Sequence, residues 1–314
     1  MRVVGVDEFG GPEALKVFEV PSPEPGPGQV RIRVHAATVN PTDTLFRAGA
    51  QAGNLRKAEP PFIPGMDAAG VIDAIGPQND GRLSVGERVV ALVLPGGSRG
   101  GAYAEQIVVP AVSVVRAPKD VDFPAASTLL MNGLTARLTL DALGLHEGQS
   151  LAVTGAAGAY GAYVVELALA EGLRVIADAS PKDEELVRSL GVYEIVPRGD
   201  SVAVAIRELV PEGVDALADG SLQGASVIPA IADGGGYAVV RGWDGELDRG
   251  ITVHRILVST AAKETAALER LVQQAEAGQL SLRVADVIPA AQASGAHRRL
   301  EAGGVRGRLV LDFS

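Results

Sequence analysis

Residues 150–161 read SLAVTGAAGAYG, a short apolar run with β-strand character that leads into a glycine-rich turn and then an apolar helical segment. A strand, a turn of the form A-x-G-x-x-G and a helix are typical of a dinucleotide-binding unit. Gly158 lets the backbone approach a pyrophosphate, and Gly161 lets the helix pack closely on the strand. The helix start offers N–H groups and a positive dipole end to the phosphates. We expect a bound dinucleotide to contact Ala156, Ala157, Gly158, Ala159, Tyr160 and Gly161, the alternative being a glycine turn that only packs.

Strands and helices alternate around this turn. We expect strands at residues 150–155, 174–179, 193–197, 214–220, 237–242 and 254–259, and helices at residues 124–143, 161–171, 183–190, 201–209 and 222–232. This alternation predicts βαβ units and a doubly wound parallel sheet, hence an α/β fold.

The segments on either side of that region have a different texture. Residues 1–121 consist of short β-rich runs broken by Gly and Pro, which predicts a β-rich domain. Residues 261–314 predict helix 263–280, strand 283–289, helix 290–303 and strand 307–313, and some of these should return to the first domain. We therefore expect a dinucleotide-binding domain, residues 122–260, inserted into a domain formed by residues 1–121 and 261–314.

Composition excludes several classes of protein. A formal charge of −10 disfavours nucleic acid and anionic membranes as partners. Residues 151–170 carry one charge, but their glycine cluster beside a strand argues against a membrane span, and no secretory signal is recognisable at the N-terminus, so we expect a cytoplasmic protein. The chain has no cysteine, and none of its four histidines lies within four residues of another, so we expect no bound metal.

Two further enzyme classes can be tested against the sequence. None of the five tyrosines is followed four residues later by lysine, which excludes a short-chain dehydrogenase. Residues 96–100, GGSRG, match the G-x-S-x-G of serine hydrolases, but a strand-like segment follows where a helix is required. We interpret these residues as a hairpin loop.

Cofactor choice depends on the end of the strand at residues 174–179, where an acidic residue would favour NAD over NADP. Counting from Gly161, we place the discriminating position at Ala179. Ser180 and Lys182 follow and could bind a 2′-phosphate, so NADPH is favoured. Two alternatives stay open: Lys182 could merely begin a solvated helix, and Asp178 is only one position away.

Several segments together resemble the zinc-independent NADPH:quinone oxidoreductase family of the medium-chain dehydrogenase/reductase superfamily. They include VNPTDTLFRAG at residues 39–49, PPFIPGMDAAGVIDAIG at 60–76, MNGLTARLTLD at 131–141 and AHRRLEAGGVRGRLVLDF at 296–313, and the resemblance covers nearly the whole chain. It implies a GroES-like catalytic domain, a Rossmann domain with NADPH in the cleft between them, and a homodimer formed through a sheet edge such as residues 254–259.

The resemblance also implies the chemistry. Zinc-dependent relatives carry Cys and His where this chain has Asn40 and Met66, and their four-cysteine loop is missing here. We therefore expect metal-free transfer of hydride from NADPH to a quinone or enone, with Asn40 and Thr135 near the nicotinamide, Asp43 supporting Asn40, and Asn132 lining the pocket.

Alternatives to these assignments remain. Asn40 could be an ordinary turn former, Asp43 a helix cap and Thr135 a helix filler. Arg306 and Arg308 could approach the phosphates or lie in a solvated turn. An enoyl-thioester or aldehyde reductase, or a non-catalytic NADPH-binding protein, would share the scaffold. The tyrosine that many relatives carry after the Arg-Ala-Gly run has no counterpart in residues 51–59.

Overall fold

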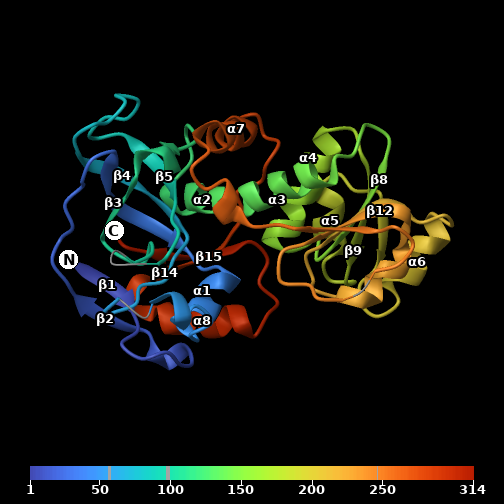
Figure 1. Ribbon diagram of the computed structural model, residues 1–314, viewed down its shortest axis with the longest axis horizontal. Helices are drawn as coiled ribbons and strands as arrows, with labels where there is room; N and C mark the ends of the chain where they lie inside the picture. The colour runs from blue at the N-terminus through green and yellow to red at the C-terminus, as the bar shows by residue number, and fades with distance from the viewer. Residues whose placement is uncertain (56–57, 97–99, 246) are drawn as a thin grey trace. The chain divides into compact units, whose positions relative to one another are not determined.

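The computed structural model describes residues 1–55, 58–96, 100–245 and 247–314 and divides the chain into two compact units (Figure 1). Unit 1 contains Met1–Met131, Ser259–Ala277 and Leu282–Ser314, and unit 2 contains Asn132–Val258 and Gly278–Ser281. The expected α/β class is confirmed. The inserted unit is shorter at its start than expected, because residues 122–131 pack with unit 1.

Unit 2 is built on a six-stranded parallel sheet in the order β10-β9-β8-β11-β12-β13. The chain runs from β8 outward through β9 to β10, then crosses back to β11 on the other side of β8, which is the doubly wound topology expected. The strands are β8 (Ser150–Thr154), β9 (Arg174–Ala179), β10 (Glu194–Pro197), β11 (Val214–Asp219), β12 (Ile231–Val239) and β13 (Thr252–Arg255).

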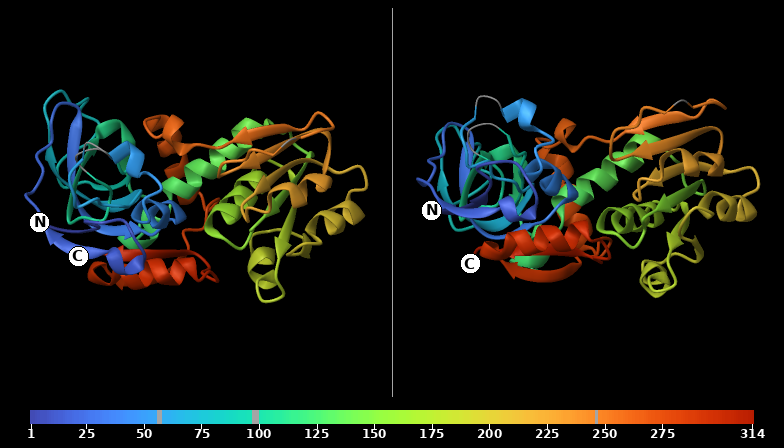
Figure 2. Two further views of the ribbon diagram at one scale, coloured as in Figure 1. Left: turned by 60° about the horizontal axis from the view of Figure 1, so that its bottom comes forward. Right: turned by 90° about the horizontal axis from the view of Figure 1, so that it is seen from below.

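Helices cover both faces of this sheet (Figure 2). Right-handed crossovers require this, because the chain leaves β8 in opposite directions for the two halves of the sheet. α4 contacts β8 and β9, whereas α6 packs on the 3-10 helix Gly224–Ala230. The helices are α3 (Leu130–Leu143), α4 (Ala159–Ala170), α5 (Glu184–Ser189) and α6 (Val202–Leu209).

Three expectations about elements of this region were wrong. The helix expected at residues 124–143 is broken into α2 (Phe123–Ser127) and α3, where the Ser127 and Thr128 hydroxyls bond to backbone carbonyls. The helix expected at 222–232 is a 3-10 helix containing Pro229, which lacks an N–H. The strand expected at 254–259 is β13, which ends at Arg255; Ile256 donates to the carbonyl of Val239, the last residue of β12, so no partner remains beyond it.

Unit 1 is organised around a seven-stranded, mainly antiparallel sheet. Its order is β14-β15-β3-β4-β5-β7, with β6 paired to β3, and a separate pair is formed by β1 and β2. The strands are β1 (Arg2–Gly5), β2 (Lys16–Glu19), β3 (Gln29–Thr38), β4 (Asp67–Ile75), β5 (Arg88–Leu92), β6 (Gln106–Pro110), β7 (Val114–Arg116), β14 (Val284–Pro289) and β15 (Arg308–Asp312).

The C-terminal strands return to unit 1 as expected. β15 pairs antiparallel with β3, and β14 lies parallel to β15, joined to it through α8 (Ala293–Glu301). α1 (Pro41–Arg47) contacts α8, α2 packs on β3 and β4, and α7 (Thr265–Glu276) contacts β7. The start and the end of the chain therefore share one hydrophobic core.

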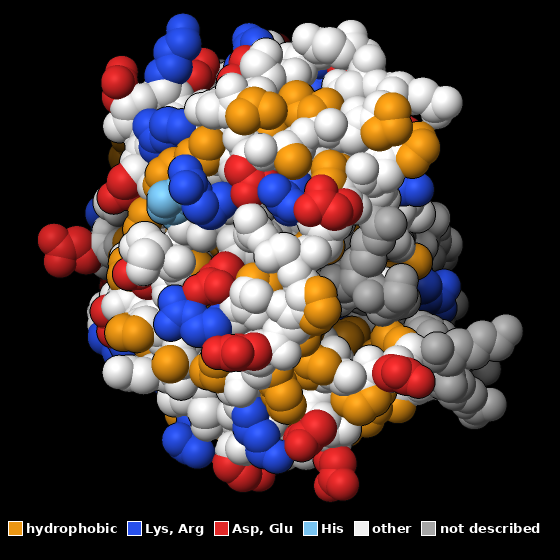
Figure 3. Space-filling view, turned by 90° about the vertical axis from the view of Figure 1, so that its left-hand side faces the viewer, with side chains coloured by type: hydrophobic (Ala, Val, Ile, Leu, Met, Phe, Trp, Pro, Cys, Tyr) orange, Lys and Arg blue, Asp and Glu red, His pale blue; other side chains and the backbone are white. Residues whose placement is uncertain are grey.

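Two properties of the surface bear on partners. No helix of the described residues is long and apolar enough to cross a membrane. On the face shown in Figure 3, acidic and basic side chains are interspersed with apolar ones, so neither sign of charge dominates it.

Candidate functional site

The turn after β8 can be formed only with glycine at two of its positions. Gly155 has a φ of +70°, which disfavours other residues. A Cβ at position 161 would lie 2.4 Å from the carbonyl oxygen of Gly155, so Gly161 allows α4 to begin this close to the strand. Gly158 is the N-cap of α4. The N–H groups of the first helical turn have no acceptor within the helix, so the turn fits the pyrophosphate of a dinucleotide.

Asp219, at the end of β11, holds the turn from one side. It accepts hydrogen bonds from the Thr154 hydroxyl at 2.7 Å and from the Tyr237 hydroxyl at 2.9 Å, and from the backbone N–H of Gly224 at 2.9 Å. Gly220 N–H donates to the Thr154 carbonyl. The ends of β8 and β11 are thus fixed together. We did not identify Asp219 from the sequence, although an acidic residue ending an apolar strand was a usable signal.

Asp178, at the end of β9, holds the turn from the other side. Its Oδ1 accepts hydrogen bonds from the N–H groups of Gly155 at 2.7 Å and Ala156 at 3.2 Å. Its Oδ2 is buried and has no hydrogen-bond partner among the residues described, and burial raises the pKa of this carboxyl. The carboxylate that reaches the turn is therefore that of Asp178, one residue before the position that counting from Gly161 indicated.

The two side chains expected to bind a 2′-phosphate have different environments. The Ser180 hydroxyl donates to Oδ2 of Asp183 at 2.5 Å, so its single proton is already used in a hydrogen bond to a carboxylate. Lys182 is exposed at the turn before α5. Asp183 is buried, so its carboxylate is a fixed part of this turn.

The hydroxyl of Tyr160 joins α4 to α3. Thr139 donates to the carbonyl of Thr135 at 2.9 Å, and the oxygens of Thr139 and Tyr160 lie 2.8 Å apart. Because the single proton of Thr139 goes to the carbonyl, Tyr160 is the donor in the second bond. Burial raises the pKa of Tyr160, which keeps it a neutral donor. The structure thus places Thr135 and Tyr160 in one hydrogen-bonded chain.

Asn132 is placed differently. It lies near the start of α3, and its Nδ2 is buried with no acceptor among the residues that the structure covers. Buried amides are normally hydrogen-bonded, so an unpaired one indicates a group that is completed by a ligand or water.

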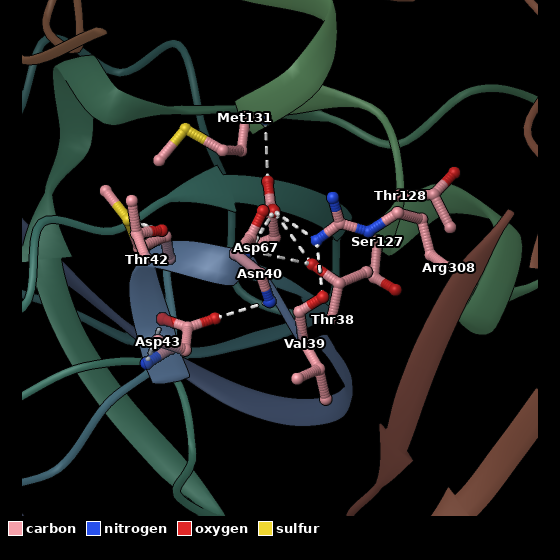
Figure 4. Close-up of polar contacts among 12 residues, drawn as sticks. Thr38, Val39, Asn40, Thr42, Asp43, Asp67, Ser127, Thr128, Met131 and Arg308 are labelled. Carbon is pink, nitrogen blue, oxygen red and sulfur yellow. Dashed lines mark hydrogen bonds and ion pairs between the residues drawn. The ribbon is translucent and has the colours of Figure 1, made fainter. Parts of the chain in front are cut away.

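In unit 1, the expected residue Asn40 bonds to a residue that was not expected, Asp67, at the start of β4 (Figure 4). Oδ2 of Asp67 accepts from Nδ2 of Asn40 at 3.0 Å and from the Thr38 hydroxyl at 2.8 Å, while Oδ1 accepts from the backbone N–H of Met131 at 2.7 Å. Burial raises the pKa of Asp67. The amide of Asn40 is thus held in place by this buried carboxylate.

Asp43 fixes the start of α1. Its Oδ2 accepts from the backbone N–H of Asn40 at 2.8 Å and its Oδ1 from that of Gly65 at 3.0 Å. The carboxyl is fully buried, and burial raises its pKa to about 7. Asp43, which is labelled in Figure 4, therefore ties the Asn40 segment to the chain before Met66.

Arg308 belongs to this cluster and not to a phosphate site. Its guanidinium donates to the carbonyl of Val39 at 2.9 Å and lies 4.0 Å from Oδ2 of Asp67, and it is buried. Arg306 donates to the carbonyl of Val305. The sequence did not identify Asp67, but a carboxylate within the apolar run around residues 63–72 indicates that it has a buried partner.

The places that hold zinc ligands in zinc-dependent relatives are occupied by other contacts. The Thr42 hydroxyl donates to the sulfur of Met66 at 3.0 Å, and Asn40 is bonded to Asp67. Within residues 1–55, 58–96, 100–245 and 247–314, no group of three His, Cys, Asp or Glu side chains could hold a metal ion. The central residues of the G-x-S-x-G match, 97–99, lie outside the described residues.

Two segments of the chain match known protein families. Residues 26–119 match the family described as alcohol dehydrogenase GroES-like domain, and residues 190–311 match that described as zinc-binding dehydrogenase. The expected GroES-like character of unit 1 is thereby confirmed.

Individual relatives agree with this. The chain is 34% identical to human quinone oxidoreductase over 198 residues, which is 62% of this chain and 58% of that relative. Among solved structures, an NAD-dependent alcohol dehydrogenase is 30% identical with a TM-score of 0.86, and a mycobacterial protein complexed with NADPH is 29% identical with a TM-score of 0.86. Both alignments cover 99% of each chain.

Proposed function

Because the chain belongs to the quinone oxidoreductase family of the medium-chain dehydrogenase/reductase superfamily, we propose that it is an NAD(P)H-dependent reductase of quinones or other conjugated carbonyl compounds. The match spans less than two thirds of the length of the human relative, so the proposed activity is argued from the residues of this chain and not from that relative. The expected preference for NADPH rests on Ser180 and Lys182.

The observation that carries the proposal is the turn at Gly155–Gly161. Gly161 is the residue without which α4 could not begin against the strand, and Asp178 and Asp219 hold the turn from both sides. A turn fixed in this way presents the start of α4 to a pyrophosphate. In such a protein, the reduced nicotinamide would supply a hydride, which is two electrons and one proton, to a conjugated acceptor, and the second proton of the product would come from water.

The chain's own residues would contribute mainly by position. In a quinone or enone, conjugation spreads the negative charge that develops on the acceptor oxygen, so one or two hydrogen-bond donors suffice. The unpaired Nδ2 of Asn132 is our candidate donor. The amide of Asn40 already donates to Asp67, so we assign Asn40 and Asp43 to shaping the start of α1. The carbonyl of Thr135 orients the Thr139 hydroxyl that links α3 to Tyr160.

We also propose that the reaction needs no metal ion. Asn40 and Met66 replace the Cys and His of zinc-dependent relatives, and their side chains are engaged with Asp67 and Thr42. Metal analysis of the purified protein, and assay after incubation with a chelator, test this. Stoichiometric zinc together with loss of activity on chelation would contradict it.

A substrate panel tests the activity. Purified protein is assayed for oxidation of NADH and NADPH with quinones, free enones, enoyl thioesters and aldehydes, with Asn132→Ala as the site variant. We expect consumption with quinones or free enones and a slower rate in the variant. Turnover confined to enoyl thioesters or aldehydes would replace the proposed substrate class, and cofactor binding without any turnover would indicate a non-catalytic binding protein.

We further propose a homodimer formed through the edge of the unit 2 sheet. β13 is the last strand in the sheet order, and within the described residues its outer edge pairs with no strand. Exposed strand edges favour pairing with a second copy. Sedimentation velocity should give twice the mass of one chain, whereas a monomer at micromolar concentration would exclude it.

A further inference from the structure

We propose that His297 and Tyr103 form a buried proton relay to Asp43, in which a proton enters at Nδ1 of His297 and the Tyr103 hydroxyl passes a proton on to the carboxyl. Protonation of Asp43 and a change of tautomer at His297 are then one event. The inference concerns unit 1 alone and does not depend on the proposed reaction.

The relay is a line of three fully buried side chains. The Tyr103 hydroxyl oxygen lies 3.1 Å from Nε2 of His297 and 3.5 Å from Oδ2 of Asp43. His297 belongs to α8 and Asp43 to α1, and these two helices contact each other (Figure 1). The Tyr103 hydroxyl therefore connects a side chain of one helix to a side chain of the other.

The Tyr103 ring is held in this position. Its backbone N–H donates to the carbonyl of Pro64 at 3.0 Å, and its carbonyl accepts from the N–H of Val4 at 2.8 Å. A Cβ at position 65 would lie 2.6 Å from the ring, so only glycine leaves room for it, and the N–H of Gly65 donates to Oδ1 of Asp43. The two contacts of the hydroxyl are therefore fixed by the backbone around it.

The Tyr103 hydroxyl has one proton for two neighbours. When Asp43 is ionised, the hydroxyl donates to Asp43, and Nε2 of His297 carries the ring proton and donates to the hydroxyl oxygen. When Asp43 is protonated, the carboxyl donates to the hydroxyl, the hydroxyl donates to Nε2, and the ring proton is on Nδ1. Each state pairs all the atoms along the line, so the proton on Asp43 decides the tautomer of His297.

Proton transfer along the line converts the first state into the second. One proton from solvent binds Nδ1 of His297, the Nε2 proton moves to the Tyr103 oxygen, and the Tyr103 proton moves to Oδ2 of Asp43. The protein gains one proton in all. Nδ1 is buried and has no hydrogen-bond partner among the residues described, so it is the end of the line at which an internal water can donate.

The charges around the carboxyl make Asp43 the group that titrates. Burial raises its pKa to about 7, Asp67 of β4 raises it further, and Arg308 of β15 lowers it. Burial also raises the pKa of Tyr103, which keeps the hydroxyl protonated. Asp43 therefore gains and loses its proton near neutral pH while Tyr103 keeps its own.

The imidazole of His297 stays neutral over the same range. Burial lowers its pKa to about 3, and Arg47 of α1 lowers it further. Arg47 is itself paired with Glu301 of α8, so the cation stays beside the ring. Any change in the ring nitrogens near neutral pH is therefore a change of tautomer and not of charge.

The test is an NMR titration of the wild-type protein, which needs neither cofactor nor substrate. Nitrogen-15 shifts of the imidazole report the tautomer, carbon-13 shifts of the carboxyl report the proton on Asp43, and His297→Gln assigns the imidazole signal. We expect the two ring nitrogens of His297 to exchange shift positions with the midpoint of Asp43, within about half a pH unit. Separate midpoints, or a His297 signal that is constant while Asp43 titrates, would overturn the relay.

Two variants test the connection itself. Tyr103→Phe keeps the ring and removes the hydroxyl, so Asp43 should still titrate while the nitrogens of His297 no longer exchange positions. Asp43→Asn should fix one tautomer at every pH. His254, on β13 of unit 2, is the internal control, and its signal should be the same in the wild type and in both variants. A His297 tautomer that still follows Asp43 in folded Tyr103→Phe would contradict the proposal.

Discussion

Replacing Asp43 by Asn should change how the stability of unit 1 depends on pH. The folded carboxyl has a pKa of about 7, above its ordinary value of 3.8, because it is completely buried. Between these two pH values the folded protein binds more protons than the unfolded chain. The free energy of unfolding therefore falls as the pH rises from about 4 to about 7 and levels off above that.

The magnitude follows from the difference of about three between the two pKa values. Each whole step in pKa is worth about 1.4 kcal/mol, so Asp43 alone should lower the free energy of unfolding by about 4 kcal/mol across this range. Asp43→Asn removes the titration. It also loses one of the two backbone hydrogen bonds from Asn40 and Gly65, because an amide has only one acceptor oxygen, so the variant is less stable at acidic pH.

Amide hydrogen exchange of β3 and β15, corrected for intrinsic rates at each pH, reports unit 1 directly. The lone Trp243 does not, because it lies in unit 2. The free energy of unfolding of the wild type minus that of Asp43→Asn should fall steadily, by about 4 kcal/mol in all, from pH 4 to 7. Asp7→Asn is the control: Lys16 lowers the pKa of this exposed carboxyl, so its removal gives no such trend. Parallel profiles for wild type and Asp43→Asn would refute the reasoning.

Two further substitutions test the two units separately. Asp67→Ala leaves the Arg308 guanidinium buried without its carboxylate and should destabilise unit 1 by about 3–5 kcal/mol, with a smaller loss in Asp67→Asn. Urea unfolding, followed by the hydrogen exchange of β4, measures this loss. A loss below about 1 kcal/mol would count against the proposed role of the Asp67–Arg308 pair. Asn132→Ala removes the unpaired amide and should lower the turnover rate about tenfold while leaving the dissociation constant of the cofactor within about twofold of the wild-type value. An equal loss of turnover rate and of cofactor affinity would indicate a structural role.

The sequence predicted most of unit 2 because its signals are local. Apolar runs of strand length alternate with helical segments, and the glycine turn at Gly155–Gly161 marks the first βα unit, so the sheet and its order follow from general rules of topology. The end of β13 could not be predicted in this way. It depends on where β12 ends, and the chain from 254 to 259 remains apolar past that point.

The residues that were missed depend on tertiary contacts. Arg308 and Asp67 lie close together in space although most of the chain separates them in sequence, and no local sequence pattern links them. The carboxylate that reaches the turn is that of Asp178, one residue before Ala179, and because successive strand residues point to opposite faces of a sheet, one step along the strand decides which side chain does so. Counting along a sequence does not fix a strand to that accuracy.

Titration of NADH into Gly158→Asp tests the central claim that the turn before α4 binds a dinucleotide. Gly158 is an N-cap in an extended conformation, with φ −71°, where Asp is a favoured residue, but a Cβ there would lie 3.0 Å from the carbonyl oxygen of Gly155, so the fold of the variant is checked by circular dichroism. Its carboxylate would occupy the pyrophosphate site and repel the pyrophosphate, so we predict that NADH binds at least about a hundredfold more weakly than to the wild type. The uncharged Gly158→Asn variant should have an intermediate affinity. Wild-type affinity in folded Gly158→Asp would contradict the account.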